Sequence, residues 1–507
     1  MKNNYLIFLI ALIFLVTTEM YSQINTPPSG LDRYKFPIFS APSGYVPEKL
    51  AITEQAFTLT LRDGVILDCS RFFPTNRTPG LPGGYPCVIM CHGYGDSKKV
   101  LRAEARAQAR YGYAVYTFSM RGQGFSGGLS NLISTTEADD LIELVRYAKA
   151  DTIPFLDTNK MLIMGGSQGG IIPMMALTRG LKVGSICSSV ASPTFATSWI
   201  ENGCIKMTYL WTITYDTSIA RYSNEVKAIA RWLYQSGTKN DKWDSIAYYT
   251  PKNRDFPDKV HLITTPIYVE NTWQDYFFNA LGNIQALQFF PANHMTYFGA
   301  VAGHGGDTSY TENQWTNQFY DDWFSYFEDG VDNGLFTKRK KYNFAYTTYP
   351  RVNNMWTFIH DSSAVFPPPG FTNTKFYFAA NNHLNPIIIN SPIKEVAFNN
   401  NVIDKNITMK FAVDNAFTGK AFNSKFKKDS VYFETDPLTS TVKMLGIPKL
   451  TLKYRSDANI CQYNLQISEV KSTGEVNMVT RINYTDRRYV TNTNKTAIIN
   501  GIAHGHI

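Results

Sequence analysis

One short stretch of this 507-residue chain has the residue types and spacing of a serine nucleophile. Gly165-Gly166-Ser167-Gln168-Gly169 follows the pattern Gly-x-Ser-x-Gly, in which the outer glycines permit a turn too tight for larger side chains. The apolar run 161–164 before it predicts a buried strand, and the apolar segment 170–177 after it predicts a packed helix. Such a nucleophile elbow exposes the Ser167 hydroxyl where N–H groups at the helix start face a developing negative charge. The chemistry would be acyl transfer.

A serine hydroxyl needs a base to take its proton, and the base needs an orienting carboxylate. In open α/β sheets these groups lie beyond the carboxyl ends of strands, and along the chain they follow the serine with the histidine last. Of the eight histidines, only His92 and His304 directly follow a predicted strand, and only His304 comes after Ser167. We therefore predict His304 as the base.

The carboxylate predicted to orient His304 is Asp275. It follows the predicted strand 266–270 and lies between Ser167 and His304 in the chain. Two rivals are Glu270, which sits within that strand, and Asp307, which lies on the far side of His304. The position of Glu270 should direct it away from the loop.

Two donors are needed to hold the oxyanion of a tetrahedral intermediate. One is predicted to be the backbone N–H of Gln168, the residue after the nucleophile. The other is expected from the loop 92–94, through a backbone N–H or the phenol of Tyr94. We expect no metal and no organic cofactor.

The elements around these residues alternate between strands and helices, which predicts a parallel sheet wound on both faces. An Asp-Gly hairpin opens the series, and Ser134 with Glu137 has the form of a capping box. The predicted strands are 57–61, 65–73, 86–91, 113–118, 161–164, 182–190, 266–270 and 295–301, the last parallel one. The predicted helices begin near 99, 134, 170 and 312, and another runs to about 289.

The predicted domain boundaries lie where the alternation of strands and helices stops. Residues 23–335 are predicted to form an α/β-hydrolase domain, interrupted at about 192–260 by an aromatic, helix-like cap. Residues 340–507 contain short, alternating, turn-bounded segments, which predict an all-β sandwich. Four of these segments are 342–349, 374–378, 450–454 and 463–467.

The first 22 residues read as a secretory signal peptide, with a charged start and the apolar run 5–16. That run is shorter than the roughly 20 residues a membrane-spanning helix needs. We therefore expect cleavage near Ser22, an exported protein that is periplasmic or extracellular, and no stable membrane insertion afterwards.

Charge and cysteine content exclude several other classes. The net charge of +8 is modest, and its densest cluster, Lys338–Lys341, has no nucleic-acid-binding module around it. The six cysteines are scattered and mostly lie in apolar runs, which predicts that most of them are buried thiols. The expected partner is a peptide or small ester substrate, with no nucleic acid; a homo-oligomer is compatible with the sequence.

Taken together, these segments resemble the Xaa-Pro dipeptidyl-peptidase and cocaine-esterase-like family of α/β-hydrolases. In the α/β part the similar segments are 61–67, 121–128, 165–170, 273–275 and 303–305. Segments 435–438 and 450–457 resemble the jelly-roll domain of that family, so the resemblance spans about residues 50–485. It implies Ser167 as nucleophile, Asp275 as acid, His304 as base and Tyr94 as oxyanion tyrosine.

Three departures from the family pattern stand out. Ser119 occupies a position where members often have Asp. The chain stops at Ile507, short of the closing strands usual for the jelly roll, so we expect a shortened domain or a truncated sequence. Aromatic residues 276–278 follow Asp275, where amino-acid-ester hydrolases of the family use acids to hold a substrate ammonium.

The sequence therefore predicts a serine hydrolase that acts through an acyl-enzyme, first a dipeptidyl-peptidase-like (Xaa-Pro) peptidase or acyl hydrolase, with a carboxylic-ester hydrolase as the alternative. The choice between a peptide and an ester substrate stays open. A peptidase needs an anionic pocket for the substrate's N-terminus, and Glu201 or Asp216 in the cap could supply it. The alternative from another class is an inactive surface binding protein whose β domain holds the ligand.

Overall fold

The computed structural model describes residues 50–75, 84–152, 154–235, 240–273, 275, 277–299, 304, 310–352, 355–387, 431–474 and 476–507. The predicted signal peptide, 1–22, and the rival acid Asp307 lie outside these residues. Within the described ranges no helix is long and apolar enough to cross a membrane.

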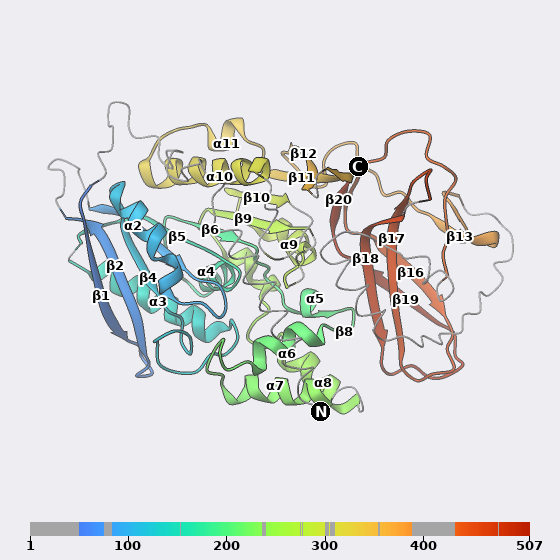
Figure 1. Ribbon diagram of the computed structural model, residues 1–507, viewed down its shortest axis with the longest axis horizontal. Coiled ribbons are helices and arrows are strands. Elements are labelled where there is room, and N and C mark those ends of the chain that lie inside the picture. The colour runs from blue at the N-terminus through green and yellow to red at the C-terminus, as the bar shows by residue number, and fades with distance from the viewer. Residues whose placement is uncertain are drawn as a thin grey trace.

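A 12-stranded sheet forms the centre of the molecule (Figure 1). Its strands are β1 (Ile52–Thr60), β2 (Ile66–Pro74), β3 (Tyr85–Cys91), β4 (Ala114–Phe118), β5 (Leu156–Gly166), β6 (Ser185–Ser189), β9 (Ile267–Thr272), β10 (His294–Gly299), β11 (Tyr342–Val352), β12 (Met355–Ser363), β15 (Met444–Gly446) and β20 (His504–His506). The spatial order is β1-β2-β4-β3-β5-β6-β9-β10-β11-β20-β15, with β12 beside β11. The run from β4 to β11 is parallel, and the predicted hairpin β1–β2 is antiparallel, as expected.

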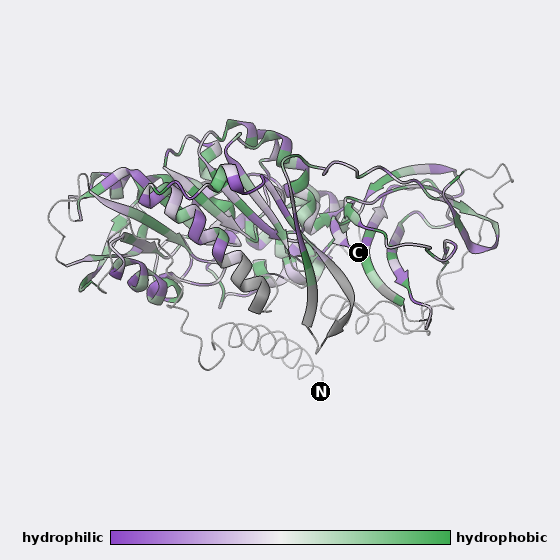
Figure 2. Cartoon of the chain, turned by 90° about the horizontal axis from the view of Figure 1, so that it is seen from above, coloured by the Kyte–Doolittle hydropathy of each residue, from purple (hydrophilic) through white to green (hydrophobic). Residues whose placement is uncertain are grey.

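Helices cover both faces of this sheet. They are η1 (Lys98–Leu101), α2 (Arg102–Arg110), α3 (Thr135–Ala150), α4 (Gln168–Thr178), α9 (Ala280–Ala286), η3 (Leu287–Phe289), α10 (Tyr310–Phe324), η4 (Ser325–Asp329) and α11 (Leu335–Lys338). Alternate side chains of β3 enter two different clusters, Ile89 packing with α3 and α4, and Val88 with α2 and α10. The inner strands β3 and β4 are therefore buried almost throughout. In Figure 2 hydrophobic residues, in green, lie along the strands of the central sheet. The predicted α/β-hydrolase fold is confirmed.

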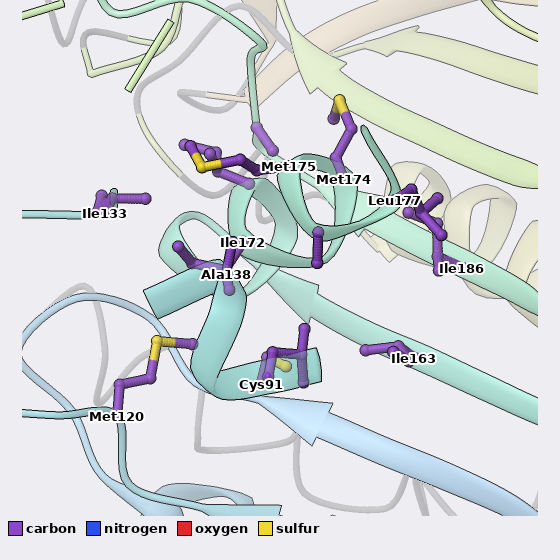
Figure 3. Packing of buried hydrophobic residues seen from close by; sticks show 14 of the residues in the cluster. Cys91, Met120, Ile133, Ala138, Ile163, Ile172, Met174, Met175, Leu177 and Ile186 are labelled. Atoms are coloured by element: carbon purple, nitrogen blue, oxygen red, sulfur yellow. The ribbon is translucent and has the colours of Figure 1, made fainter. Parts of the chain in front are cut away.

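Helix α4, which begins at the elbow, is buried along its whole length. Ile172 and Met175 pack with Ala138 of α3 and with Ile163 of β5 in one cluster (Figure 3). Helix α3 begins with the predicted capping box, in which Ser134 and Glu137 cap each other's backbone N–H groups. This packing on every side holds the start of α4, and with it Ser167, in one position.

The sheet does not end at β10, and here the sequence-based expectation was wrong. Strand β11 pairs parallel with β10, β12 pairs antiparallel with β11, and β20 pairs parallel with β11. Residues 342–349 therefore extend the central sheet instead of beginning a separate domain. His360, His504 and His506, which fall within the predicted β domain 340–507, lie on strands β12 and β20 of the central sheet.

The interruption after β6 is mostly helical and lies along one side of the α/β part (Figure 1). Its elements are α5 (Ala196–Trp199), β7 (Ile200–Glu201), β8 (Cys204–Ile205), α6 (Met207–Tyr215), α7 (Asn224–Gln235), α8 (Asn240–Tyr249) and η2 (Pro257–Leu262). We call the stretch from α5 to η2 the cap.

The remaining C-terminal elements form small antiparallel sheets at the other end of the molecule (Figure 1). They are β13 (Tyr377–Ala379), η5 (Ala380–Asn382), β14 (His383–Asn385), β16 (Lys449–Tyr454), β17 (Cys461–Val470), β18 (Val476–Asp486) and β19 (Lys495–Asn500). β13 pairs with β14, β16 with β19 and β17 with β18. The β-rich character is confirmed, whereas the jelly roll stays a prediction.

The β7–β8 turn of the cap docks on β18. The Asn202 side chain donates hydrogen bonds to the carbonyls of Asn483 (2.9 Å) and Asn500 (2.8 Å), and the Thr485 N–H donates to the Asn202 carbonyl (3.0 Å). Gly203, at φ 86°, lies so close that an added Cβ would be 2.7 Å from the Thr485 carbonyl oxygen. The C-terminal sheets are therefore joined to the cap through backbone contacts.

All six cysteines are free thiols, five of them buried and Cys204 partly exposed. The prediction of buried thiols therefore holds for five of the six.

Glu328 in η4 offers a test of how burial shapes stability. Both of its carboxyl oxygens are buried, and neither has a hydrogen-bond partner among the described residues. Burial raises its pKa well above the usual value, and the nearby Asp329 acts in the same direction. The folded protein therefore holds a proton there that the unfolded chain releases above its ordinary pKa, and stability falls as pH rises through that window.

We expect Glu328→Gln to raise the free energy of unfolding by about 1–3 kcal/mol at pH 8. At pH 4, where the carboxyl is mostly protonated in both states, the variant and the parent should be nearly equal. Urea unfolding at the two pH values measures this difference. An equal effect at both pH values would show that the carboxyl is not the cause.

Candidate active site

The turn that carries Ser167 is strained in the way a nucleophile elbow requires. Ser167 has φ 58° and ψ −126°, a conformation that side-chain-bearing residues rarely adopt. An added Cβ at Gly165 would lie 2.3 Å from the Cys91 carbonyl oxygen, and one at Gly169 would lie 2.2 Å from it. Both glycines are therefore required by the backbone of β3, as predicted from the spacing.

The elbow is fixed to its neighbours on two sides. The Ser167 N–H donates to the Ser189 carbonyl at the end of β6 (2.9 Å). The buried side chain of Gln168 pairs with that of Gln123, whose amide donates to the Gln168 oxygen at 2.9 Å. The Gln123 oxygen also accepts from the Gly95 N–H (2.9 Å). Gln123 thus ties the elbow to the loop after β3, a role that its sequence position alone did not reveal.

Asp275 and His304 meet beyond the ends of the neighbouring strands β9 and β10. His304 Nδ1 lies 2.7 Å from Asp275 Oδ2, and the Asp275 side chain is fully buried. The other carboxylate oxygen accepts the N–H groups of Phe277 (2.7 Å) and Phe278 (2.9 Å). Both oxygens are therefore occupied, and the carboxylate can hold Nδ1 protonated and direct the ring edge that carries Nε2 away from itself.

Two aromatic rings hold the imidazole plane. The rings of Phe277 and Phe278 lie 4.9 and 5.8 Å from that of His304, both edge to face. Phe277 also contacts Tyr209 of the cap at 5.0 Å. Phe277 and Phe278 thus line one side of the histidine, and neither carries a charge that could hold a substrate ammonium. Tyr276 lies outside the described residues.

Trp273 fixes the loop that carries Asp275. Its indole N–H donates to the Ala345 carbonyl of β11 (2.7 Å), and its ring stacks on Phe298 of β10. Gly505 of β20 approaches so closely that an added Cβ would be 3.0 Å from the indole nitrogen. The additional strands β11 and β20 therefore support the candidate site directly.

Tyr94, the other predicted oxyanion donor, is hydrogen-bonded to a different side chain in this structure. Its phenol oxygen lies 3.1 Å from the Ser130 hydroxyl, and burial raises its pKa well above the usual value. The phenol therefore stays protonated and can donate, although its partner here is Ser130. The structure brings the loop of Tyr94 to the elbow through Gln123 and Gly95.

The rejected candidates have structural roles. His92 is buried, its Nδ1 lies 2.7 Å from the Gly93 carbonyl oxygen and its Nε2 accepts from the Met120 N–H (2.9 Å). Burial lowers its pKa to about 4, so it is neutral. Glu270 accepts a hydrogen bond from Tyr320 on α10 (3.0 Å). Within the described residues no group of three or more His, Cys, Asp or Glu side chains could hold a metal ion.

Comparison with known proteins finds a family match over the part of the chain that carries these residues. Residues 63–305 match the model of the X-Pro dipeptidyl-peptidase (S15) family, which confirms the predicted resemblance. The chain is a serine hydrolase. The match favours an enzyme over the surface binding protein considered from the sequence.

Solved structures similar to this hydrolase extend over nearly the whole chain. A CocE/NonD family hydrolase from Staphylococcus aureus has 14% identity and a TM-score of 0.64, covering 90% of this chain and 87% of its own. An aminopeptidase from a marine sediment Thaumarchaeota archaeon has 13% identity and a TM-score of 0.65, with coverages of 95% and 90%. An alpha-amino acid ester hydrolase has 13% identity and a TM-score of 0.64, with the same coverages. Because these identities are only 13–14%, the three structures show a similar fold and do not show a shared activity.

Proposed function

We propose that this hydrolase cleaves a carboxylic ester through an acyl-enzyme. Ser167 Oγ attacks the carbonyl carbon while His304 takes its proton, and the tetrahedral oxyanion forms. His304 then gives the proton to the leaving alcohol. A water, deprotonated by His304, then attacks the acyl carbon. His304 returns that proton to Ser167 Oγ as the ester bond to the serine breaks and the acid is released.

The observation that carries this proposal is the 2.7 Å contact between His304 Nδ1 and the buried Asp275, beyond strand ends on the same edge of the sheet as Ser167. A buried carboxylate stabilises the imidazolium formed when the serine proton is transferred. The strained elbow supports Ser167 as its partner, because such a conformation persists only where the surroundings enforce it.

For the oxyanion we propose the backbone N–H of Gln168 and a donor from the loop of Tyr94. Gln168 is the first residue of α4, where N–H groups lack partners within the helix. The phenol of Tyr94 can serve if it exchanges Ser130 for the substrate oxygen.

The proposed preference for esters rests on the two cap acids considered for binding a peptide N-terminus. The Glu201 carboxylate is buried and lies 2.7 Å from the Lys206 ammonium, with the Asn483 amide donating to it at 2.6 Å. Asp216 accepts from the Ser218 N–H (2.9 Å) and hydroxyl (2.6 Å) in its own turn. Both acids are engaged within the protein, which disfavours an ammonium site built on either.

Xaa-Pro dipeptidyl-peptidase activity is the second candidate, because the matching family model is of that type. We also propose that the enzyme acts outside the cytoplasm, on the strength of the leader 1–22.

Comparing p-nitrophenyl butyrate with Gly-Pro-p-nitroanilide tests the choice of substrate. We expect turnover of the ester and little or none of the anilide, with the Ser167→Ala protein as the blank for both. Robust cleavage of the anilide would establish the dipeptidyl-peptidase instead.

A further inference from the structure

A cluster of charged side chains lies where the cap meets the C-terminal sheets. The Glu201 carboxylate is 2.7 Å from the Lys206 ammonium and 3.6 Å from the Arg481 guanidinium. Glu201 is on β7, Lys206 immediately precedes α6 and Arg481 is on β18. Two cations therefore share one carboxylate, and the cluster has one positive charge in excess.

Arg481 is the member of the cluster with the most hydrogen-bond donor capacity left unused. Its Nε is buried and has no hydrogen-bond partner among the described residues. Its recorded ion pair with Glu201, at 3.6 Å, is longer than a good charge-assisted hydrogen bond. The side chain keeps 30% of its surface exposed, so a solute can reach it. A partly buried guanidinium with open donors is well suited to a carboxylate.

A short series of aromatic contacts runs from the triad to the cap helix that follows Lys206. From the His304 ring, Phe277 is at 4.9 Å, and Tyr209 is a further 5.0 Å from Phe277. Burial raises the pKa of Tyr209, and the charges of Arg481 and Asp275 act on its phenol in opposite directions.

A second connection runs through Asn279, close to Asp275 in the chain. The Asn279 amide lies 3.5 Å from Glu201 Oε1, and it also donates to the Thr197 carbonyl at 2.8 Å. His304, Phe277, Tyr209, Lys206 and Arg481 are all only partly buried, so each keeps some surface open to solvent.

The effect of the two cations on the pKa of Glu201 agrees with the contacts within the cluster. Although burial favours its neutral form, the charges of Lys206 and Arg481 hold the pKa of Glu201 below its usual value. Glu201 is thus an anion that balances one of the two cations. The charge of Asp275 also acts on Lys206, so the excess positive charge lies mainly on Arg481. Beside Arg481 a substrate ammonium would be repelled and a carboxylate attracted.

We propose that Arg481, with Lys206, forms a subsite for an ionised carboxylate, so that the preferred substrates are esters that carry a second, free carboxylate. The proposal rests on the ester hydrolysis proposed above and names its substrate class. It also gives the C-terminal sheets a function, because β18 supplies the guanidinium.

Matched pairs of esters test the subsite. Mono-p-nitrophenyl glutarate against p-nitrophenyl pentanoate places the carboxylate in the acyl part, and 4-butanoyloxybenzoate against its methyl ester places it in the alcohol part. We expect kcat/KM to favour the anion about tenfold or more in at least one pair, the range of a charged hydrogen bond. Rates of the Ser167→Ala protein are subtracted as background.

Variants that change the charge of the cluster in opposite directions distinguish a loss of carboxylate recognition from general damage to the site. Arg481→Gln should lower the anion-to-neutral ratio about tenfold, Arg481→Lys should keep most of it, and Glu201→Gln should raise it because the excess positive charge grows. Arg488→Gln is the matched control, since Arg488 lies on the surface and pairs with Asp244 of the cap. It should leave the ratio unchanged.

The outcomes distinguish this proposal from the one it rests on. Turnover of the neutral esters without preference for either anion, or a fall of the ratio in both Arg481→Gln and Glu201→Gln, would overturn the subsite and leave the esterase standing. Failure to hydrolyse any of the four esters would sink the proposed function itself.

Discussion

Ser167→Ala is expected to lower kcat by about 10⁶, the loss measured when the nucleophile of a comparable triad is removed. The strained turn should survive the change, because its shape is enforced by Gly165 and Gly169 against the Cys91 carbonyl and by the hydrogen bond from the Ser167 N–H to Ser189. Folding should therefore be normal while turnover is lost. Initial rates with p-nitrophenyl butyrate, together with the unfolding midpoint of the variant, measure the two effects separately.

A serine that is exposed but outside the chemistry serves as the control. Ser218 lies in the cap, where it hydrogen-bonds to Asp216. Ser218→Ala should keep the parental rate. If Ser167→Ala retained most of its activity, another nucleophile would have to be found.

Asp275→Asn is expected to lower kcat by about 10⁴, because it changes the tautomer of His304 without emptying the site. The Asn oxygen would keep the two N–H groups of Phe277 and Phe278, which donate to Oδ1 at 2.7 and 2.9 Å. Its amide would then face His304 Nδ1, now 2.7 Å from Oδ2. An NH₂ group there favours an imidazole protonated on Nε2, which cannot accept the serine proton.

Glu270→Gln provides the comparison for Asp275→Asn, since Glu270 is the rival acid on β9 and accepts from the Tyr320 phenol at 3.0 Å. It should change kcat much less. A larger loss in Glu270→Gln than in Asp275→Asn would reverse the assignment of the orienting acid. Crystal or NMR data on His304 in the Asn variant can report the tautomer directly.

The elbow and the Asp275–His304 pair could be anticipated because their signals are local. Gly165, Ser167 and Gly169 are close in sequence, and the steric demand that selects them acts within one turn. Asp275 and His304 each follow an apolar strand, and parallel strands bring their carboxyl ends to one edge. The position after a strand reduced eight histidines to His92 and His304, and chain order then left His304.

The full extent of the sheet could not be anticipated, because alternating residues predict a strand without naming its partner. Residues 342–349 read equally well as a strand of a sandwich or of the central sheet, and only the pairing of β11 with β10 decides between them. The support that Trp273 receives from Ala345 and Gly505 depends on that pairing.

The charged cluster could not be predicted from the sequence for a similar reason. Glu201 was considered as an anchor for a substrate ammonium, but its partner Arg481 lies 280 positions later in the chain. A long-range ion pair leaves no mark on the sequence around either residue. The pairing of Tyr94 with Ser130 was equally out of reach.

The most direct test of the central claim is labelling of the full-length protein with a fluorophosphonate, followed by peptide mass spectrometry. A serine activated by His304 and Asp275 reacts at its Oγ, so we predict one adduct, on the peptide that contains Ser167, and none in the Ser167→Ala or His304→Ala proteins. An adduct on a different residue, or no adduct on active enzyme, would contradict the account.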